Sequence, residues 1–336
     1  KVTGEYIGKI TPQGIVKAKN TQRTVYEYAN SMFLSSMLKD ITPQLQECFP
    51  DEWKELAALA IVRTIRNTPI KYVKEVWEKL YLSTKIEASL SRNTVSELLR
   101  GVGADYHAQS KFFSWLMSGK SIFYFDLSSI FSQSANLNLA EKGYNKDHLF
   151  LNQINFALLF SQQQKTPVML KCMPGSIRDV KSLSTLMEEF PLKDCIVIMG
   201  RGFFSKSNIY GLISVGASFI LPLRRNSKLI DYKIKPDKLF MYRDRGIKFT
   251  VKELNEGGGR LRLFFYEDVL LRGEEHSNLI KMRITRGKHG LEIDESRLGK
   301  ISILTNLDWD GERVYGLYKE KEVVEFYERV ESKDLE

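Results

Sequence analysis

Hydrophobic residues recur at helical spacing through much of the first third of the chain. WKELAALAIVRTI (53–65) and YVKEVWEKLYLS (72–83) each place their apolar side chains along one face of a helix. SLSRNTVSELLRGVG (89–103) begins with Ser91 or Asn93 as a candidate N-cap, as expected where a helix starts. We therefore predict helices here, arranged either as a helix-turn-helix that reads DNA or as a bundle that only packs.

The pattern changes to that of strands after Gly119. Short apolar runs separated by turn residues predict strands, and two amphipathic stretches between the later runs predict helices. In chain order, we predict strands at 121–132, 151–163 and 166–175, a helix at 179–190, a strand at 196–199, a helix at 205–216 and a strand at 218–223. This is the element order of the ribonuclease H-like fold. The predicted fold class is therefore α/β (mixed α+β), with a five-stranded mixed sheet flanked by helices.

Two further patterns flank this core. Residues 1–20 alternate in polarity and contain Gly4, Gly8 and Gly14, which predicts a β-hairpin or an extended arm. Residues 224–300 are strand-prone and rich in charge and glycine, which predicts a β-rich insertion. The predicted organisation is an N-terminal β arm (1–23), a helical, DNA-binding region (24–119), the first part of the core (120–223), the insertion (224–300), and the last strand and helix of the core (301–336).

The composition narrows the class of protein. The formal net charge of +9 is compatible with a polyanionic partner such as DNA. The three cysteines, Cys48, Cys172 and Cys195, form no CxxC pair, which argues against a disulfide framework or a zinc ribbon. This cysteine usage fits a reducing cytosol, so we expect a cytoplasmic, nucleoid-associated protein. No run of about 18 apolar residues is present, so we expect no membrane span. The start at Lys1 is compatible with a fragment of a longer protein.

Acidic residues supply the candidate chemistry. Asp126 ends an apolar strand, and Glu325 lies on the last predicted helix, which is able to pack beside the sheet. A strand-end aspartate is ordinary by itself, but carboxylates that converge on one sheet edge suit divalent cations. Two such ions about 4 Å apart clamp the attacking and leaving oxygens of a phosphodiester. The strand in CIVIMGRGFF, by contrast, ends at Gly200, which has no side chain.

Five stretches of the chain carry a resemblance to a known family. They are FYFDLSSIFS, KGYNKDHLFLNQINFALLFS, TPVMLKCMPGSIRDV, IVIMGRGFFSKSNIYGLISVGASFILPLR and YKEKEVVEFY. In this order they resemble the DDE transposases of prokaryotic insertion sequences, in the group with a tyrosine-arginine-glutamate-lysine signature. The resemblance runs from about residue 121 to 330. It implies a DNA-binding enzyme that uses two Mg²⁺ (or Mn²⁺) ions for DNA strand cleavage and strand transfer in transposition, a form of DNA recombination.

The resemblance also assigns roles to individual residues. Asp126 matches the first catalytic aspartate and Glu325 the catalytic glutamate, and both would be metal ligands. Tyr318 and Lys321 match the tyrosine and the arginine of the signature, and the lysine keeps the charge without the bidentate fork of arginine. The signature lysine falls on Ser332.

Gly200 occupies the place of the second catalytic aspartate, directly before Arg201. Glycine offers no oxygen ligand, and the loss of one ligand of a metal pair is expected to slow the reaction roughly a thousandfold or more. Asp194, the nearest acid, lies at the other end of the strand, roughly 20 Å away at about 3.3 Å per residue. We therefore predict an intact fold with absent or impaired catalysis, unless another residue is the second acid.

Basic residues near these positions are candidates for DNA contacts. A dense basic run begins at residue 224, and its interleaved aromatic residues are expected to pack within the insertion. The candidate DNA-binding residues are Arg201, Arg224, Arg225, Lys228, Tyr318 and Lys321. The expected partners are the inverted repeats at transposon ends and the target DNA, and a homodimer in a synaptic complex is one assembly that this function allows.

Three functional hypotheses follow. The first is an insertion-sequence transposase that is impaired at Gly200. The second is a transposase-derived DNA-binding protein that has lost catalysis altogether. The third is a nuclease of the same fold, which would differ only in lacking strand transfer.

Overall fold

The computed structural model describes residues 8–17, 25–134, 136–144, 151–256, 259–285 and 295–321. The chain divides into two compact units, residues 1–109 and residues 110–336. No helix in these described ranges is both long and apolar enough to cross a membrane.

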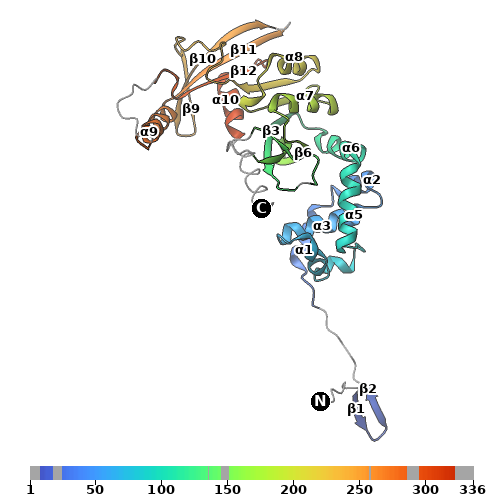
Figure 1. The fold of residues 1–336 in the computed structure, drawn as a ribbon. Coiled ribbons are helices and arrows are strands. Elements are labelled where there is room, and N and C mark those ends of the chain that lie inside the picture. The colour runs from blue at the N-terminus through green and yellow to red at the C-terminus, as the bar shows by residue number, and fades with distance from the viewer. Residues whose placement is uncertain are drawn as a thin grey trace. The chain divides into compact units, whose positions relative to one another are not determined.

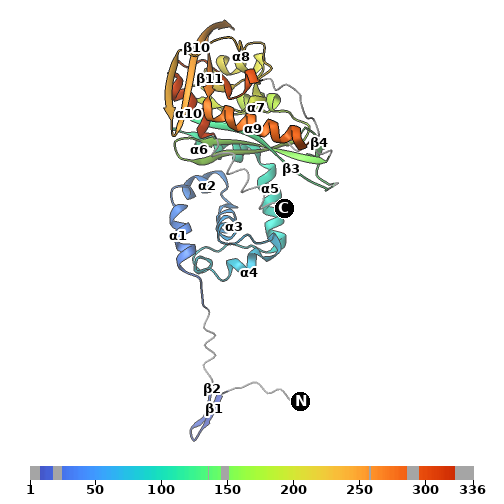
Figure 2. The ribbon, with the colours of Figure 1, turned by 90° about the vertical axis from the view of Figure 1, so that its left-hand side faces the viewer.

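The first unit is helical apart from a short antiparallel hairpin. The hairpin strands are β1 (Gly8–Thr11) and β2 (Gly14–Lys17). The helices are α1 (Ala29–Met37), α2 (Thr42–Cys48), α3 (Trp53–Ile65), α4 (Val73–Trp77), α5 (Arg92–Ala104) and the start of α6 (Tyr106–Met117), with 3₁₀ turns η1 (Ile70–Tyr72) and η2 (Tyr81–Thr84). Figure 2 shows α3 at the centre of this helical group, where its apolar face is buried. The predicted cap of α5 is confirmed, because the Ser91 hydroxyl accepts the backbone N–H of Thr94.

The continuous helix predicted over 72–83 is wrong. The chain instead forms α4 and η2, which are separated by an extended residue, Leu80. The reason is a pairing with a distant segment: Glu27 N donates to Lys79 O, and Tyr81 N donates to Glu27 O. These two bonds hold Leu80 in the extended region, and its side chain is fully buried.

The second unit is built on one large mixed sheet. Its first strands and helices are β3 (Ile122–Phe131), β4 (Glu141–Lys142), β5 (Asn152–Ser161), β6 (Thr166–Pro174), α7 (Asp179–Glu189), β7 (Ile196–Ile198), η3 (Arg201–Phe203), α8 (Lys206–Ser214) and β8 (Ser218–Pro222). The central strands lie in the order β6-β5-β3-β7-β8, and β4 also pairs with β5. β5 is antiparallel to β3 and β6, whereas β3, β7 and β8 are parallel. This arrangement confirms the predicted ribonuclease H-like sheet.

Each face of the sheet has its own helical cover. Phe123 and Phe125 of β3 point into a core shared with α7 and α8, which lie next to each other (Figure 1). Tyr124 points to the opposite face, where it packs with Val314 and Tyr315 of α10 (Gly311–Glu320). Because side chains alternate along a strand, Asp126 shares the face of Tyr124 and therefore the side that α10 covers.

The segment between β8 and α10 extends the same sheet. β12 (Lys300–Thr305) pairs with β8, and β11 (Gly259–Asp268), β10 (Arg245–Glu256) and β9 (Lys238–Tyr242) continue outward in antiparallel order (Figure 1). Residues Val269–Thr285 form helix α9, where strand-prone sequence was expected, and η4 (Glu295–Arg297) precedes β12. α9 starts where the Asp268 carboxylate accepts the backbone N–H of Leu271 and so caps its first turn.

Candidate active site

Asp126 lies on β3, level with the end of β7. The strands β3 and β7 pair in parallel from Ile122↔Ile196 to Tyr124↔Ile198, and the pairing stops there. β3 itself continues to Phe131 alongside β5, so the expectation that Asp126 ends its strand is corrected: it is the neighbouring strand that ends. β7 therefore ends beside Asp126, whose side chain lies on the α10 face of the sheet.

Gly200 lies just past the end of β7, beside Asp126. Continued by two residues, the parallel register that pairs Tyr124 with Ile198 places Gly200 opposite Asp126. A Cβ atom at Gly200 would lie 3.9 Å from Asp126 Oδ1 and 3.8 Å from the ring of Phe203, both ordinary van der Waals separations. Its backbone, with φ −85° and ψ 171°, is extended and open to any residue. A Cβ atom at position 200 would therefore fit, between the carboxylate of Asp126 and the ring of Phe203.

A second glycine, Gly202, lets the loop that carries Gly200 pack closely against the start of α7. The carboxylate of Asp179, at the start of α7, occupies the place where a Cβ of Gly202 would stand. Asn208 of α8 adds two bonds, because its side-chain amide donates to the carbonyls of Val180 and Phe203. The turn after β7 is thus held against both α7 and α8.

Lys321 reaches Asp126 from the end of α10. It is the C-cap residue of that helix, and its Nζ donates to Asp126 Oδ2 at 2.8 Å. Asp126 and Lys321 are only 7 % and 6 % exposed, so the pair is withdrawn from solvent. Within the described residues, Lys321 is the one hydrogen-bond donor that reaches the Asp126 carboxylate.

Glu320 forms a second link between α10 and the same sheet. Its carboxylate accepts the Tyr124 hydroxyl at 3.1 Å, the Gln162 amide at 2.9 Å and the Lys165 ammonium at 3.2 Å. Burial favours a higher pKa for Glu320, but the bonds from Gln162, Lys165 and Tyr124 outweigh it and lower the pKa. Burial, followed by the nearby Glu320 charge, raises the pKa of Tyr124 well above its usual value. Two neighbouring residues of α10 thus bind two residues on one face of β3.

The remaining signature positions are placed only in part. Tyr318 lies on α10, half-buried against the aromatic core of that face. Glu325 and Ser332 lie outside the described residues. The structure therefore brings Asp126, position 200 and Lys321 together.

These residues do not fit a pair of divalent cations. Gly200 offers no oxygen, and Oδ2 of Asp126 is bonded to an ammonium group. No cluster of three or more histidine, cysteine, aspartate or glutamate residues capable of holding a metal occurs within the described ranges. Hard divalent cations prefer several anionic oxygens, whereas the described site presents one carboxylate and one cation.

The candidate DNA-binding residues differ in their surroundings. Arg201, Arg224 and Lys228 are exposed. Arg225 is half-buried, and its guanidinium donates to Glu275 of α9 at 2.5 Å, so it joins two parts of the 224–300 segment.

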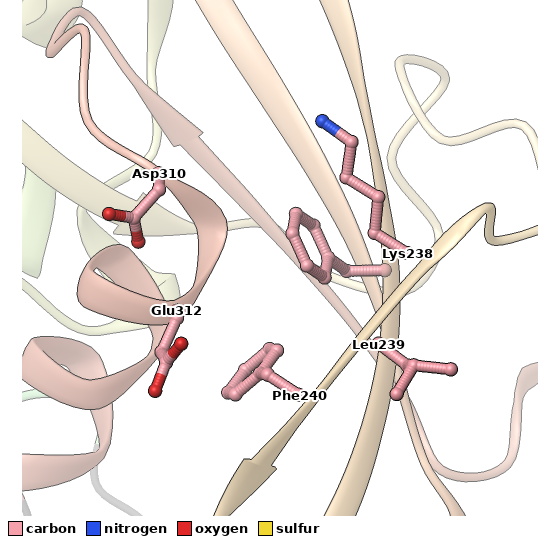
Figure 3. A pocket seen from close by; sticks show the side chains of 6 residues that line it. Lys238, Leu239, Phe240, Asp310 and Glu312 are labelled. Carbon is pink, nitrogen blue, oxygen red and sulfur yellow. The ribbon is translucent and has the colours of Figure 1, made fainter.

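The aromatic residues of the insertion pack, as expected. Phe240 and Tyr242 both meet Tyr315 of α10 edge-on, at ring-centroid distances of 5.6 and 5.3 Å. Beside them is an open pocket of about 420 Å³ between β9 and the start of α10 (Figure 3). Its lining residues are Lys238, Leu239, Phe240, Phe249, Asp310 and Glu312, and they include no residue of the Asp126 site.

Sequence reasoning missed the bonds that join α10 to the sheet. The pairing of Lys321 with Asp126 spans 195 positions, and those of Glu320 with Gln162 and Lys165 span 158 and 155. No local sequence pattern predicts hydrogen bonds between residues so far apart in the chain. The position of Lys321 in the signature was a pointer to the site, although not to its partner.

The sheet order and the position of Asp126 define the class of protein: a ribonuclease H-like protein with an acidic residue on the central strand β3. A family model described as the transposase DDE domain matches residues 128–325, which is more than half of the chain. The chain therefore belongs to the transposase DDE domain family. Asp126 lies two positions before the matched range, on the same strand.

Solved structures of transposases are similar to this chain at low identity. The piggyBac transposase in a synaptic complex with hairpin DNA is 10% identical over 84% of this chain, with a TM-score of 0.41. The Mos1 transposase in a paired-end complex with the left transposon end is 10% identical over 49% of this chain, with a TM-score of 0.21. The chain covers 57% of each of those two chains. No curated protein matches the sequence.

Proposed function

We propose that the protein is a DNA transposase by descent whose centre for DNA strand cleavage and strand transfer is impaired at Gly200. The family supports a polynucleotidyl transferase that binds DNA. The observation that carries the impairment is the position of Gly200 opposite Asp126, where a Cβ atom would lie 3.9 Å from Oδ1 of that carboxylate.

The lost group is an acid that the reaction needs. Two carboxylates facing each other across the end of β7 would share divalent cations, by resemblance Mg²⁺ or Mn²⁺, whereas in the described part of the site the one carboxylate, Asp126, is paired with Lys321. Loss of several kcal/mol of transition-state stabilisation lowers the rate roughly a thousandfold or more. The residues therefore support a chain that keeps its fold and loses most of its catalytic rate.

DNA binding does not depend on this acid. Arg201, Arg224 and Lys228 are exposed cations, and phosphate contacts of this kind supply affinity without metal. Arg201 follows Gly200 directly and is suited to a strand phosphate near the site. We infer that the natural ligands are transposon-end inverted repeats and target DNA, bound by a homodimer in a synaptic complex.

The test compares the protein with its Gly200→Asp variant on a supercoiled plasmid that carries the inverted repeats flanking the gene. Cleavage and strand transfer are followed in Mg²⁺ and in Mn²⁺. We expect Gly200→Asp to be at least about a hundredfold more active, and the matched Gly200→Asn variant to remain at the level of the parent because its side chain carries no charge. Equal activity of the parent and Gly200→Asp would refute the proposal.

One observation favours the second hypothesis, a transposase-derived DNA-binding protein without catalysis. Within the described residues, Oδ2 of Asp126 is bonded to the Lys321 ammonium, so a cation other than a metal ion already occupies that oxygen. Sequence-specific DNA binding combined with no cleavage by Gly200→Asp, even at high Mn²⁺, would support this alternative. Cleavage without strand transfer by that variant would instead indicate a nuclease.

A further inference from the structure

We propose that the ammonium of Lys321 takes the place of a divalent cation at Asp126, and that it competes with metal ions for this carboxylate. This inference deepens the proposed function and rests on Asp126 being the carboxylate of the site. It concerns Lys321, whose part in metal binding neither the fold nor the family match assigns.

The geometry gives the ammonium the position of a ligand-bound cation. Nζ lies 2.8 Å from Asp126 Oδ2, and both residues are nearly excluded from solvent. A buried carboxylate needs a compensating charge, and in the described site the lysine supplies it. A metal ion that binds Oδ2 must first displace this ammonium.

The position of Lys321 is fixed by its helix. Its backbone N–H donates to Tyr318 O at the end of α10, and the neighbouring Glu320 is bonded to Tyr124 of the same strand. The side chain therefore enters the site from a backbone that is already anchored. Anchoring reduces the entropy that the pair costs, which strengthens it as a competitor.

The charge balance points the same way. Asp126 and Lys321 together are neutral, whereas an aspartate at position 200 would add one negative charge on a side chain whose Cβ lies 3.9 Å from Asp126 Oδ1. In that variant the lysine ammonium and a metal ion would both be attracted to the two carboxylates. If the ion pair is closed in about nine of ten molecules, the apparent metal affinity falls about tenfold.

The experiment measures Mn²⁺ binding by electron paramagnetic resonance, without DNA, on the full chain. The proteins are the parent, Gly200→Asp, and Gly200→Asp with Lys321→Gln. Lys165→Gln in the Gly200→Asp background is the matched control, because it removes an ammonium from the neighbouring, exposed Glu320 pair. We expect no Asp126-dependent Mn²⁺ site in the parent, a weak site in Gly200→Asp, and at least about tenfold tighter binding when Lys321→Gln is added, but not with Lys165→Gln.

A second measurement needs no change at Lys321. In ¹⁵N-lysine spectra, the Lys321 ammonium signal is identified by its loss in Lys321→Arg. Mg²⁺ should leave this signal unchanged in the parent and should shift it in Gly200→Asp.

Either of two results overturns the inference. One is Mn²⁺ binding by the parent that Asp126→Asn abolishes. The other is binding by Gly200→Asp that Lys321→Gln does not tighten, or that leaves the Lys321 signal unmoved. Because no DNA is present, these results are separate from those of the cleavage assay: equal cleavage by parent and Gly200→Asp refutes the impairment, whatever the metal titration gives.

Discussion

Replacing Lys321 by glutamine should destabilise the second unit strongly. The change removes the ammonium but keeps a side chain of similar length, so the Asp126 carboxylate, 7 % exposed, is left without its counter-charge. Removing one partner of a buried ion pair costs about 3–5 kcal/mol, because the other charge remains buried and uncompensated.

The neighbouring ion pair provides the scale for comparison. The side chains of Lys165 and Glu320 are 48 % and 38 % exposed, and a pair this open to solvent contributes about 0–1 kcal/mol. Lys165→Gln also removes one ammonium from the same side of the sheet. The difference between the two variants therefore isolates the effect of burial.

The assay is calorimetric and urea unfolding of the full chain at neutral pH. For a unit of about 200 residues, each kcal/mol lowers Tm by about 2–4 °C, so Lys321→Gln should lower the transition of residues 110–336 by about 6–20 °C and Lys165→Gln by at most about 4 °C. Asp126→Asn added to Lys321→Gln should recover much of the loss, because it removes the unpaired charge as well. Equal destabilisation by Lys321→Gln and Lys165→Gln would refute the buried-pair argument, as would a double variant no more stable than Lys321→Gln alone.

Three further outcomes are expected. Gly202→Ala should cost about 1–3 kcal/mol in urea unfolding because its methyl group overlaps the carboxylate packed there, whereas Gly200→Ala, with open space, should stay within about 0.5 kcal/mol. Glu320 has a lowered pKa, so the stability it contributes is present above its ordinary pKa near 4.5 and is lost as pH falls through the lower folded-state pKa. Glu320→Gln should therefore be destabilising at pH 7, and its effect on Tm should shrink as the pH is lowered through that folded-state pKa. Arg224→Ala should lower the salt dependence of DNA binding by about one phosphate contact with no change in Tm, whereas Arg225→Ala should lower Tm because it breaks the bond to α9.

The core of the fold could be predicted because its signal is local. Apolar runs and turn residues alone determine where β3, β5, β6, β7 and β8 lie, and the element order then restricts how the strands can be arranged in the sheet. The prediction of a continuous helix over 72–83 was wrong for the opposite reason, because the deciding contact is not local. The pattern of these residues is helical, but bonds to Glu27 hold Leu80 extended, and such a tertiary contact outweighs local propensity.

The same distinction between local patterns and long-range packing applies to the site. The place of Asp126 and the empty position at Gly200 follow from strand patterns and from the family resemblance, and the parallel pairing of β3 with β7 brings these two positions together. The role of Lys321 could not be predicted, because it depends on which turn of α10 ends over β3. That choice is made by packing across the whole sheet, including the contacts of Tyr315 with Phe240 and Tyr242 on distant β9.

The glycine at 200 and the lysine at 321 are linked by the charge of the site. A second carboxylate at position 200 would repel that of Asp126 unless a cation lay between them. Within the described residues, the Lys321 ammonium neutralises the Asp126 carboxylate. The described part of the second unit therefore buries Asp126 with a lysine as its counter-charge, and Glu320 and Lys321 hold the end of α10 against β3.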